Sequence, residues 1–283
     1  MKNMKKLWAA LLALAMTFSL AACGGTSDED AATDDQPTGE EVSGDTAPES
    51  DVAYIQDKGT LVVAITDFAP MDYQDANGEW IGFDADMARA VAEKLGVEVQ
   101  FQVIEWDSKL LELNSKKIDC AWNGMTLTNE VLSSMECTNA YATNGQVVVM
   151  NKDALDRYAD EESLKDLSFA VESGSAGEET AADKGFKANA VSSQADALME
   201  VAAGTSDACI IDLLMATAMT GEGTGYPDLA YGLQLTTEEY GIGFRKGSDA
   251  AAKVNEALKE LYDDGTMQSL AETYGIAGAI IAQ

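Results

Sequence analysis

The sequence predicts an α/β fold of two lobes, each a mostly parallel sheet flanked by helices. Apolar, β-branched stretches alternate with stretches whose apolar residues recur at helical spacing, and this alternation occurs twice along the chain. The 283 residues are also enough for two lobes that each bury a core. Two α/β units in one chain imply a cleft between them, which is a common place for a ligand.

The first α/β unit precedes residue 123 and has the order β-α-β-α-β. Gly96 ends its first helix, and Asp107 is positioned to cap its second. This order predicts a parallel sheet with helices on both faces. The expected strands are 60–65, 97–103 and 118–122, and the expected helices are 84–95 and 108–115.

The second unit begins near residue 146 and repeats the alternation, with Gly204 closing its last helix. The chain then returns to a strand at 240–244 and ends in two amphipathic helices, 249–264 and 267–274. The expected strands of this unit are 146–150, 168–171 and 208–211, and its expected helices are 176–185 and 195–203.

Residues 1–22 have the organisation of a bacterial lipoprotein signal peptide. Three lysines precede an apolar stretch that is too short for a membrane span, and small residues lead into Cys23. The tetrapeptide "LAAC" at 20–23 resembles the lipoprotein cleavage motif, in which the cysteine becomes the first mature residue and is diacylated. The alternative is an ordinary signal peptide with a chance cysteine. We expect the protein to be lipid-anchored at Cys23 on the outer face of the cell membrane.

Residues 23–54 are expected to form a disordered, acidic tether. Nine acidic residues and no basic one lie between positions 24 and 50, with almost nothing apolar to bury. The whole chain has a formal net charge of -31, which repels nucleic acid and anionic lipid. We therefore expect no nucleic-acid partner.

The chain contains no histidine, and this excludes several kinds of chemistry. The usual general base, the Ser-His and Cys-His nucleophiles and the commonest zinc ligand are all missing. No catalytic residue, metal or cofactor is predicted. Beyond Cys23 the cysteines are odd in number, so at least one is a free thiol, and a bridge between Cys120 and Cys137 is left open.

Polar residues gather where the predicted strands end. Asp67 follows the first strand, and Asn123 and Gly124 follow the third. In the second unit, residues 172–177 and Asp212 come after two further strands. Because ligands of open parallel sheets bind beyond the carboxyl ends of the strands, these clusters together favour a binding site over isolated turns or caps.

Seven segments in a fixed order carry a family resemblance. They are "GTLVVAITDFAPMDY" (59–73), "GEWIGFDADMARAVAEKLGV" (78–97), "WDSKLLELNSKKIDCAWNGMTLTNE" (106–130), "TNAYATNGQVVV" (138–149), "ESLKDLSFAVESGSAGEE" (162–179), "ALMEVAAGTSDACIID" (197–212) and "YGIGFRKGSDAAAKVNEALKELYDDGTMQSLAETYG" (240–275). Together they resemble the substrate-binding proteins of polar amino acid ABC importers, the extracellular solute-binding family 3. The resemblance covers nearly all of residues 55–278.

The resemblance implies a type II periplasmic-binding-protein fold, in which two lobes joined by two crossovers close over a small solute. Lobe one would comprise 55–143 and 239–283, and lobe two 144–238. The solute would be an amino acid or a related amine. A membrane permease and its ATPase would be the protein partners.

The resemblance also implies the ligand contacts. Phe68 and Trp106 match aromatic residues on opposite walls, with core packing as the alternative for both. Asp212 matches the carboxylate that pairs with the ligand's ammonium group, with a helix cap as the alternative. The lobe-one segment that holds the ligand's carboxylate and ammonium groups matches Asn123, Gly124 and Thr126. The helix start in lobe two that adds N–H donors to the carboxylate matches Ser175, Ala176 and Gly177.

One position departs from the family pattern. The family reads T-x-E-R where residues 128–131 read "TNEV", so the arginine that binds the ligand carboxylate in a bidentate pair is replaced by Val131. Lys109, on the helix face of Trp106, could supply the cation. Alternatively, lobe-two N–H groups and Asn144 could hold the carboxylate without one. The third possibility is a ligand that has no α-carboxylate.

We therefore expect a lipid-anchored binding protein of an ABC importer rather than an enzyme. A solute sensor without transport is one alternative. A dehydratase-like enzyme on the same fold is another, in which Glu172 or Glu130 would act as an acid. Metal import is a weaker reading, because histidine is absent. The sequence does not identify the solute.

Overall fold

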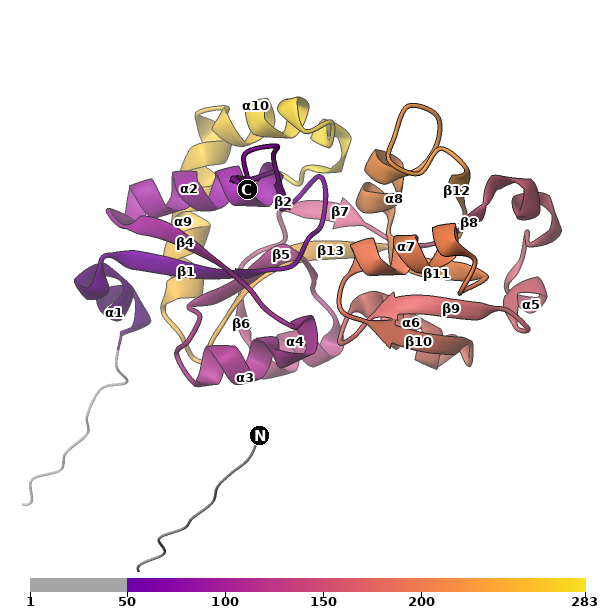
Figure 1. Cartoon of the computed structure of the whole chain (residues 1–283). Helices are drawn as coiled ribbons and strands as arrows, with labels where there is room; N and C mark the ends of the chain where they lie inside the picture. Colours follow the sequence, from indigo (N-terminus) through magenta and orange to yellow (C-terminus); the bar gives the residue numbers. More distant parts are fainter. Residues whose placement is uncertain (1–49) are drawn as a thin grey trace, which may run out of the picture. The chain divides into compact units, whose positions relative to one another are not determined.

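The computed structural model describes residues 50–283, which lie in one compact unit with two main sheets (Figure 1). The predicted signal peptide, Cys23 and the tether as far as residue 49 lie outside the described residues. Residues 51–54, which we assigned to the tether, instead begin helix α1 (Asp51–Lys58), and Ser50 is its N-cap. The folded part therefore begins before residue 55.

Lobe one is built on a six-stranded mixed sheet. Strand β1 lies between β4 and β5, and it is parallel to both, which agrees with the parallel pairing that the sequence predicts. Strand β13, from the C-terminal part of the chain, then pairs antiparallel with β5, β6 and β7. The strands are β1 (Thr60–Ile65), β4 (Glu98–Val103), β5 (Cys120–Thr126), β6 (Glu136–Cys137), β7 (Ala142–Asn144) and β13 (Glu238–Phe244).

Helices cover both faces of this sheet. Figure 1 shows α2 and α10 above it and α3 and α4 below it. Helix α2 packs on β1, β4 and β5 and also contacts α9 and α10, and a short hairpin of β2 (Tyr73–Gln74) and β3 (Trp80–Ile81) precedes it. The helices are α2 (Phe83–Leu95), α3 (Lys109–Asn114), α4 (Asn129–Ser134), α9 (Ala250–Asp263) and α10 (Thr266–Thr273), with 3-10 turns at Trp106–Ser108 and Ala277–Ala279.

Lobe two has a five-stranded sheet of order β10-β9-β11-β8-β12. The first three strands are parallel, and β8 and β12 run antiparallel to their neighbours. Its strands are β8 (Gln146–Asn151), β9 (Ser168–Glu172), β10 (Lys187–Val191), β11 (Ala208–Asp212) and β12 (Leu229–Gln234). Its helices are α5 (Glu161–Leu164), α6 (Ala176–Lys184), α7 (Gln194–Ala203) and α8 (Leu213–Met219), with a 3-10 helix at Lys152–Arg157.

The chain passes between the sheets twice, from β7 to β8 and from β12 to β13. The two crossovers lie side by side, because Leu235 N–H donates to Gln146 O and Gln146 N–H donates to Thr236 Oγ1, both at 2.8 Å. The predicted α/β fold with two sheets is confirmed, and both sheets are mixed.

Three strands extend into the polar residues that the sequence analysis placed after them. The polar row from Asn123 to Thr126 lies within β5 rather than beyond it, and β9 and β11 extend to Glu172 and Asp212. In β5 the cause is distant in sequence: Tyr240 of β13 lies opposite Thr126, so the polar row gains a backbone partner. Helix α3 begins only after the 3-10 turn, so the predicted cap at residue 107 is wrong.

The cysteines of residues 50–283 are all free thiols. Cys120 is buried in β5, Cys137 lies half-buried in β6, and Cys209 is buried in β11. The bridge between Cys120 and Cys137 that the sequence left open is therefore not formed.

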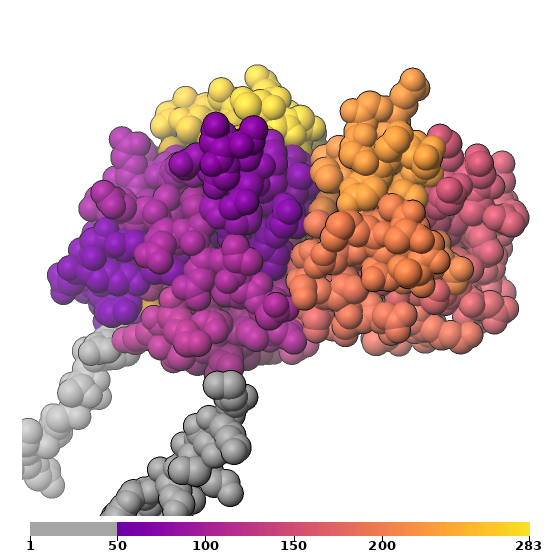
Figure 2. All heavy atoms as spheres, in the orientation of Figure 1, coloured from indigo at the N-terminus to yellow at the C-terminus, as the bar shows by residue number. Residues whose placement is uncertain are grey.

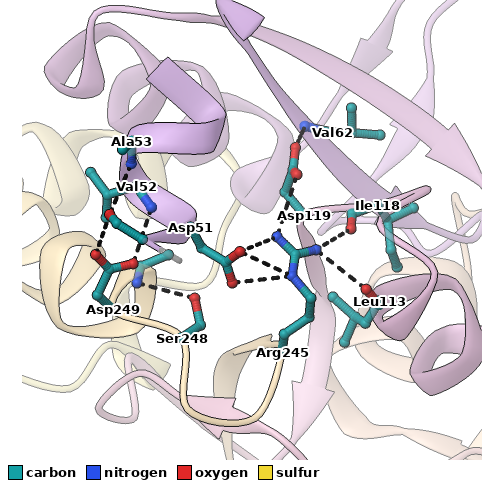
Figure 3. Close-up of polar contacts among 12 residues, drawn as sticks. Asp51, Val52, Ala53, Val62, Leu113, Ile118, Asp119, Arg245, Ser248 and Asp249 are labelled. Carbon is teal, nitrogen blue, oxygen red and sulfur yellow. Dashed lines mark hydrogen bonds and ion pairs between the residues drawn. The ribbon is translucent and has the colours of Figure 1, made fainter. Parts of the chain in front are cut away.

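Arg245, directly after β13, joins three distant parts of lobe one (Figure 3). Its Nη2 lies 2.8 Å from Asp51 Oδ1 in α1, and its Nε contacts the same carboxylate. Its Nη1 donates to Leu113 O and Ile118 O, at 3.3 and 2.9 Å. Asp119 Oδ1, 3.9 Å from Nη2, adds a second buried carboxylate. The start of the folded chain is thus tied to the entry of β5.

Candidate functional site

The lobes touch at Gly174, in the loop after β9. Its φ is +72°, and an added Cβ would lie 2.6 Å from Asp107 Cα in lobe one, so the contact requires glycine. Lys109 Nζ donates across the contact to Gly174 O at 2.8 Å, and Ser173 Oγ donates to Asp107 Oδ2 at 3.3 Å. Figure 2 shows atoms of the two lobes packed directly together on the face drawn. The structure thus has its lobes closed.

Asp212, the predicted ammonium partner, is the last residue of β11 and is only 4% exposed. Its Oδ1 accepts hydrogen bonds from Tyr240 OH at 2.7 Å, from Gln146 Nε2 at 3.1 Å and from Asn144 Nδ2. Its Oδ2 accepts one from Gln194 Nε2. All these donors are neutral, and within residues 50–283 no lysine or arginine forms an ion pair with Asp212.

The charges around Asp212 favour a cation. Burial, and then the Glu238 carboxylate, raise the pKa of Asp212 well above its usual range. Glu172, the last residue of β9, is 3% exposed, and burial raises its pKa to about 7 although Lys109 opposes the shift. Two buried oxygens here, Glu172 Oε1 and Gln146 Oε1, accept no hydrogen bond. The interior between the lobes therefore contains hydrogen-bond acceptors that no donor of residues 50–283 satisfies.

The polar row of β5 is engaged within lobe one. Asn123 Oδ1 accepts from Thr66 N at 2.9 Å and Thr66 Oγ1 at 2.7 Å, while its Nδ2 donates to Thr66 O and to Asp72 Oδ2. Gly124 N–H donates to Asp84 Oδ2 at 2.6 Å. The Asn123 side chain and the Gly124 N–H group are therefore used to hold β5 in place rather than left open for a ligand.

Thr126 and Asn144 meet at Glu238, the first residue of β13. Glu238 Oε1 accepts from Thr126 Oγ1, Asn144 Nδ2 and Gln146 Nε2, each at 2.8 Å. Asn144 and Gln146 also donate to Asp212. A continuous hydrogen-bond chain thus runs from β5 in lobe one to β11 in lobe two.

The two predicted aromatic residues occupy different places. Phe68 is buried, meets Tyr240 edge to face with ring centroids 6.4 Å apart, and lies so close to Gly124 that a Cβ there would be 2.5 Å from the ring. Trp106 is also buried, and Lys109 Nζ lies 5.0 Å from its ring centroid. Phe68 therefore borders the Asp212 contact through Tyr240, whereas Trp106 borders Lys109.

The predicted lobe-two donors lie at the start of α6. Ser175 is the N-cap, and its Oγ accepts from Glu178 N at 3.1 Å. The N–H groups of Ala176 and Gly177 have no acceptor within residues 50–283. Gly177 packs closely on β11, since an added Cβ would lie 2.8 Å from Ile210 O. This helix start offers N–H groups and the positive end of its dipole.

A cavity of about 440 Å³ lies between the lobes beside these residues. Lys109, Thr126 and Val131 line it from lobe one, and Ser175 and Ala176 from lobe two. Val131 is mostly buried against Trp106 and other apolar residues, so the position where the family carries arginine is part of a core wall.

Four residues of this site escaped the sequence analysis: Gln146, Gln194, Glu238 and Tyr240. Gln146 begins an apolar strand, and its position opposite Asp212 is set by the register of β8 and β11. Gln194 looks like the ordinary first residue of a helix. Tyr240 and Glu238 come from β13, which enters lobe one only after the chain has returned from lobe two. No local sequence signal predicts that any of them lies beside Asp212.

No group of three or more Cys, Asp or Glu residues between positions 50 and 283 is arranged to hold a metal ion. No described helix combines the length and apolar character needed to cross a membrane.

Residues 61–277 match the bacterial extracellular solute-binding proteins, family 3. The chain belongs to this family. The expectation of a binding protein rather than an enzyme is confirmed by the relatives of this family 3 protein, which are named as binding proteins.

Two curated relatives of this family 3 protein come from Bacillus subtilis. The arginine-binding extracellular protein ArtP is 30% identical over 281 residues, covering 94% of this chain and 96% of ArtP. The L-cystine-binding protein TcyA is 30% identical over 276 residues, covering 96% of this chain and 97% of TcyA.

Two solved structures extend the comparison of this family 3 protein. A mutant of ArgBP from T. maritima superposes with a TM-score of 0.74 at 32% identity, covering 80% of this chain and 99% of that one. A substrate-binding protein of an ABC uptake transporter from Streptococcus pneumoniae, with bound histidine, gives 0.72 at 28% identity, covering 78% of this chain and 94% of that one.

Proposed function

We propose that this family 3 protein captures an amino acid or a related small amine between its lobes and delivers it to an ABC importer. Relatives named for arginine, cystine and histidine support the substrate class, and the S. pneumoniae structure supports the link to an ABC uptake system. The observation in this chain that carries the proposal is Asp212, a buried interlobe carboxylate that has only neutral donors.

A ligand ammonium group would supply the positively charged partner that Asp212 lacks. An ionised carboxylate is costly to bury without a cation, and the raised pKa of Asp212 reflects that cost. Its Oδ2 accepts from Gln194 alone, so this oxygen retains acceptor capacity. Glu172, beside the same Gln194, offers further acceptor capacity for a second donor group on the ligand.

We place the ligand's carboxylate at the start of α6. The N–H groups of Ala176 and Gly177 are without acceptors, and a helix N-terminus stabilises an anion. Lys109 Nζ uses two of its three donors on Trp106 O and Gly174 O, so one remains for the carboxylate. This arrangement combines two of the explanations for the missing arginine at position 131, the Lys109 cation and the lobe-two N–H groups. The third explanation, a ligand without a carboxylate, would replace this arrangement if only amines bind.

The anchor remains part of the proposal. The "LAAC" motif supports lipidation at Cys23, which would hold the protein at the outer face of the membrane. Fractionation of cells that carry Cys23→Ser tests it, since release of the protein from the membrane fraction is expected and retention would contradict it.

Titration calorimetry of Asp212→Asn tests the ammonium site. The ligands are L-arginine, L-histidine and L-cystine together with the decarboxylated amine of each. Loss of a charged, buried partner should weaken binding by about 2 to 5 kcal/mol, which is about 30-fold or more in Kd. The matched control is Asp263→Asn, which removes a carboxylate from an exposed ion pair with Lys259 and should leave Kd unchanged. Equal affinities in the two variants would place the ammonium site elsewhere.

The same titrations on Lys109→Met separate the explanations for the missing arginine. Selective loss of the amino acids, with the amines unaffected, is expected if Lys109 faces the carboxylate. Equal loss of amino acids and amines would show that Lys109 serves only the contact between the lobes.

A further inference from the structure

Residues 279–283 lie along one edge of β7, the strand that leads into the first crossover. Ala142 of β7 pairs antiparallel with Tyr240 of β13 and also with Ile280. Because a strand has only two edges, β7 is enclosed between β13 and residues 279–283, which we call the strap. Ile280 also packs against the buried apolar core.

Three hydrogen bonds hold the strap to β7 and to the residues just before it. From donor to acceptor, they are Ile281 N to Tyr141 O at 2.9 Å, Gln283 Nε2 to Ala140 O at 3.0 Å and Thr143 Oγ1 to Ala279 O at 3.3 Å. Their partners span residues 140–143, which directly precede the crossover. The strap therefore fixes the chain to lobe one as far as Thr143.

Asn144, the last residue of β7, is held by lobe two. Its Nδ2 donates to Asp212 Oδ1 at the end of β11, and its Oδ1 accepts from Leu214 N–H in α8 at 3.2 Å. The next residue, Gly145, accepts from Leu213 N–H at 2.8 Å. The strap bonds and the first bonds to lobe two are thus made by successive residues, so a displacement of β7 would move Asn144 relative to Asp212.

We propose that the strap positions Asn144 against Asp212 by holding β7 to lobe one, and that it thereby favours the closed, ligand-binding form. Where it concerns a ligand, this role of the strap rests on the proposed function, whereas its effect on Asn144 does not. Residues of the strap are positioning residues, since they act on the site through Asn144.

The length of β7 explains why it needs a second partner. A strand of three residues makes few backbone hydrogen bonds, and such segments open at low free energy. Hydrogen bonds also weaken steeply outside a narrow range of distance and angle, so a shift of β7 by about 1 Å would weaken the bonds that Asn144 makes with lobe two. Pairing on both edges of β7 resists such a shift.

The double variant Thr143→Val, Gln283→Ala removes two strap bonds without shortening the chain. Valine keeps the shape of the threonine side chain but cannot donate to Ala279 O, and alanine cannot donate to Ala140 O. Ile280 keeps its place against the core, so we expect this strap variant to fold.

The matched control is the double variant Thr273→Val, Gln74→Ala. Thr273 Oγ1 donates to Ser269 O within α10 at an exposed position, and Gln74 is exposed on β2. The control therefore makes the same chemical changes away from β7.

Amide hydrogen exchange of the unliganded protein, measured by NMR, tests the effect on Asn144. The Ile281 amide reports on the strap, and the Leu214 amide reports on Asn144, its acceptor. Both should exchange about fivefold faster or more in the strap variant, and at the wild-type rate in the control. Amides within α7 should be unchanged in both variants. Leu214 exchange at the wild-type rate in the strap variant would overturn the proposal, as would an equal acceleration throughout lobe two.

Titration calorimetry tests the effect on binding, with L-arginine, L-histidine and L-cystine as probes. The strap variant should raise Kd by about fivefold or more, and the control should leave it unchanged. In an Asn144→Ala background the strap substitutions should have no further effect, because the residue through which they act is gone. An equal rise in Kd with and without Asn144 would overturn the positioning role. Failure of every probe to bind the wild type would refute the proposed function, and the Leu214 exchange rate would still decide on the strap.

Discussion

At residue 174 the absence of a side chain allows the two lobes to come into contact. Gly174 has a left-handed backbone and lies against Asp107 of the other lobe, while its carbonyl accepts from Lys109. Any Cβ would overlap backbone atoms of Asp107, and backbone cannot rotate aside as a side chain can. The closed form therefore depends on this glycine.

Gly174→Ala should hinder closure, and Gly185→Ala is its matched control. Both residues have a left-handed backbone, with φ of +72° and +71°, so both substitutions cost about 1 to 2 kcal/mol of local strain. Only Gly174 has a neighbour within 4 Å of the added Cβ. We expect a weaker ligand affinity and a larger radius of gyration by X-ray scattering in Gly174→Ala alone. The same change in both variants would mean that the contact is not needed for closure.

At the scale of elements, the buried charges around Arg245 join helix α1, the approach to β5 and the end of β13 (Figure 3). The start of the folded chain and its C-terminal part also meet at Asp249, whose carboxylate accepts from Ser50 Oγ at 2.5 Å and Val52 N at 3.0 Å. This corner stabilises lobe one at the point where the predicted tether would join it.

Arg245→Met should destabilise the protein strongly. Removing one partner of a buried ion pair leaves uncompensated carboxylates at Asp51 and Asp119, which typically costs about 3 to 5 kcal/mol. Lys253→Met is the comparison, because it breaks an exposed pair with Glu256 and should change stability by less than about 0.5 kcal/mol. Denaturation by urea measures both, and equal stabilities would show that the Arg245 cluster contributes little.

At the scale of the whole molecule, closure buries acidic groups from both lobes around one interior. Glu172 has a folded pKa of about 7, above its unfolded value, and the pKa of Asp212 is also raised. The protonated Glu172 therefore stabilises the unliganded protein fully below its unfolded pKa, and this contribution is lost as pH rises through about 7. A cationic ligand should bind more strongly to the ionised carboxylates than to the protonated ones, so binding favours the opposite protonation state.

Binding of a cationic ligand should therefore release protons near pH 6.5. Titration calorimetry in two buffers of different ionisation enthalpy measures the number released, which should fall when Glu172 is replaced by Gln. Affinity should also rise between pH 5 and 8, more steeply in the wild type than in Glu172→Gln. Proton uptake, or an identical pH profile in the two proteins, would contradict this account of the interior.

The sequence by itself determined the order and type of most long elements, because apolar periodicity and glycine stop signals act within a few residues. Strand 60–65 and helix 176–185 illustrate this, since the structure has β1 at Thr60–Ile65 and α6 at Ala176–Lys184. The family resemblance then named Asp212, Ser175 and Ala176. In the structure Asp212 accepts a hydrogen bond from Tyr240 of lobe one, and Ser175 and Ala176 line the cavity between the lobes.

Only the tertiary structure decided which residues those elements bring together. Tyr240 and Glu238 reach the site because β13 returns from lobe two and pairs with β5, a partnership between segments far apart in the chain. Because of the same pairing, the polar residues after position 122 lie within β5, whereas the sequence analysis placed them beyond the end of this strand. Asp72 and Asp84 both hold β5, because the turn before α2 packs closely over Gly82, which has no side chain. Such contacts depend on packing between distant segments, and local sequence patterns do not encode that packing.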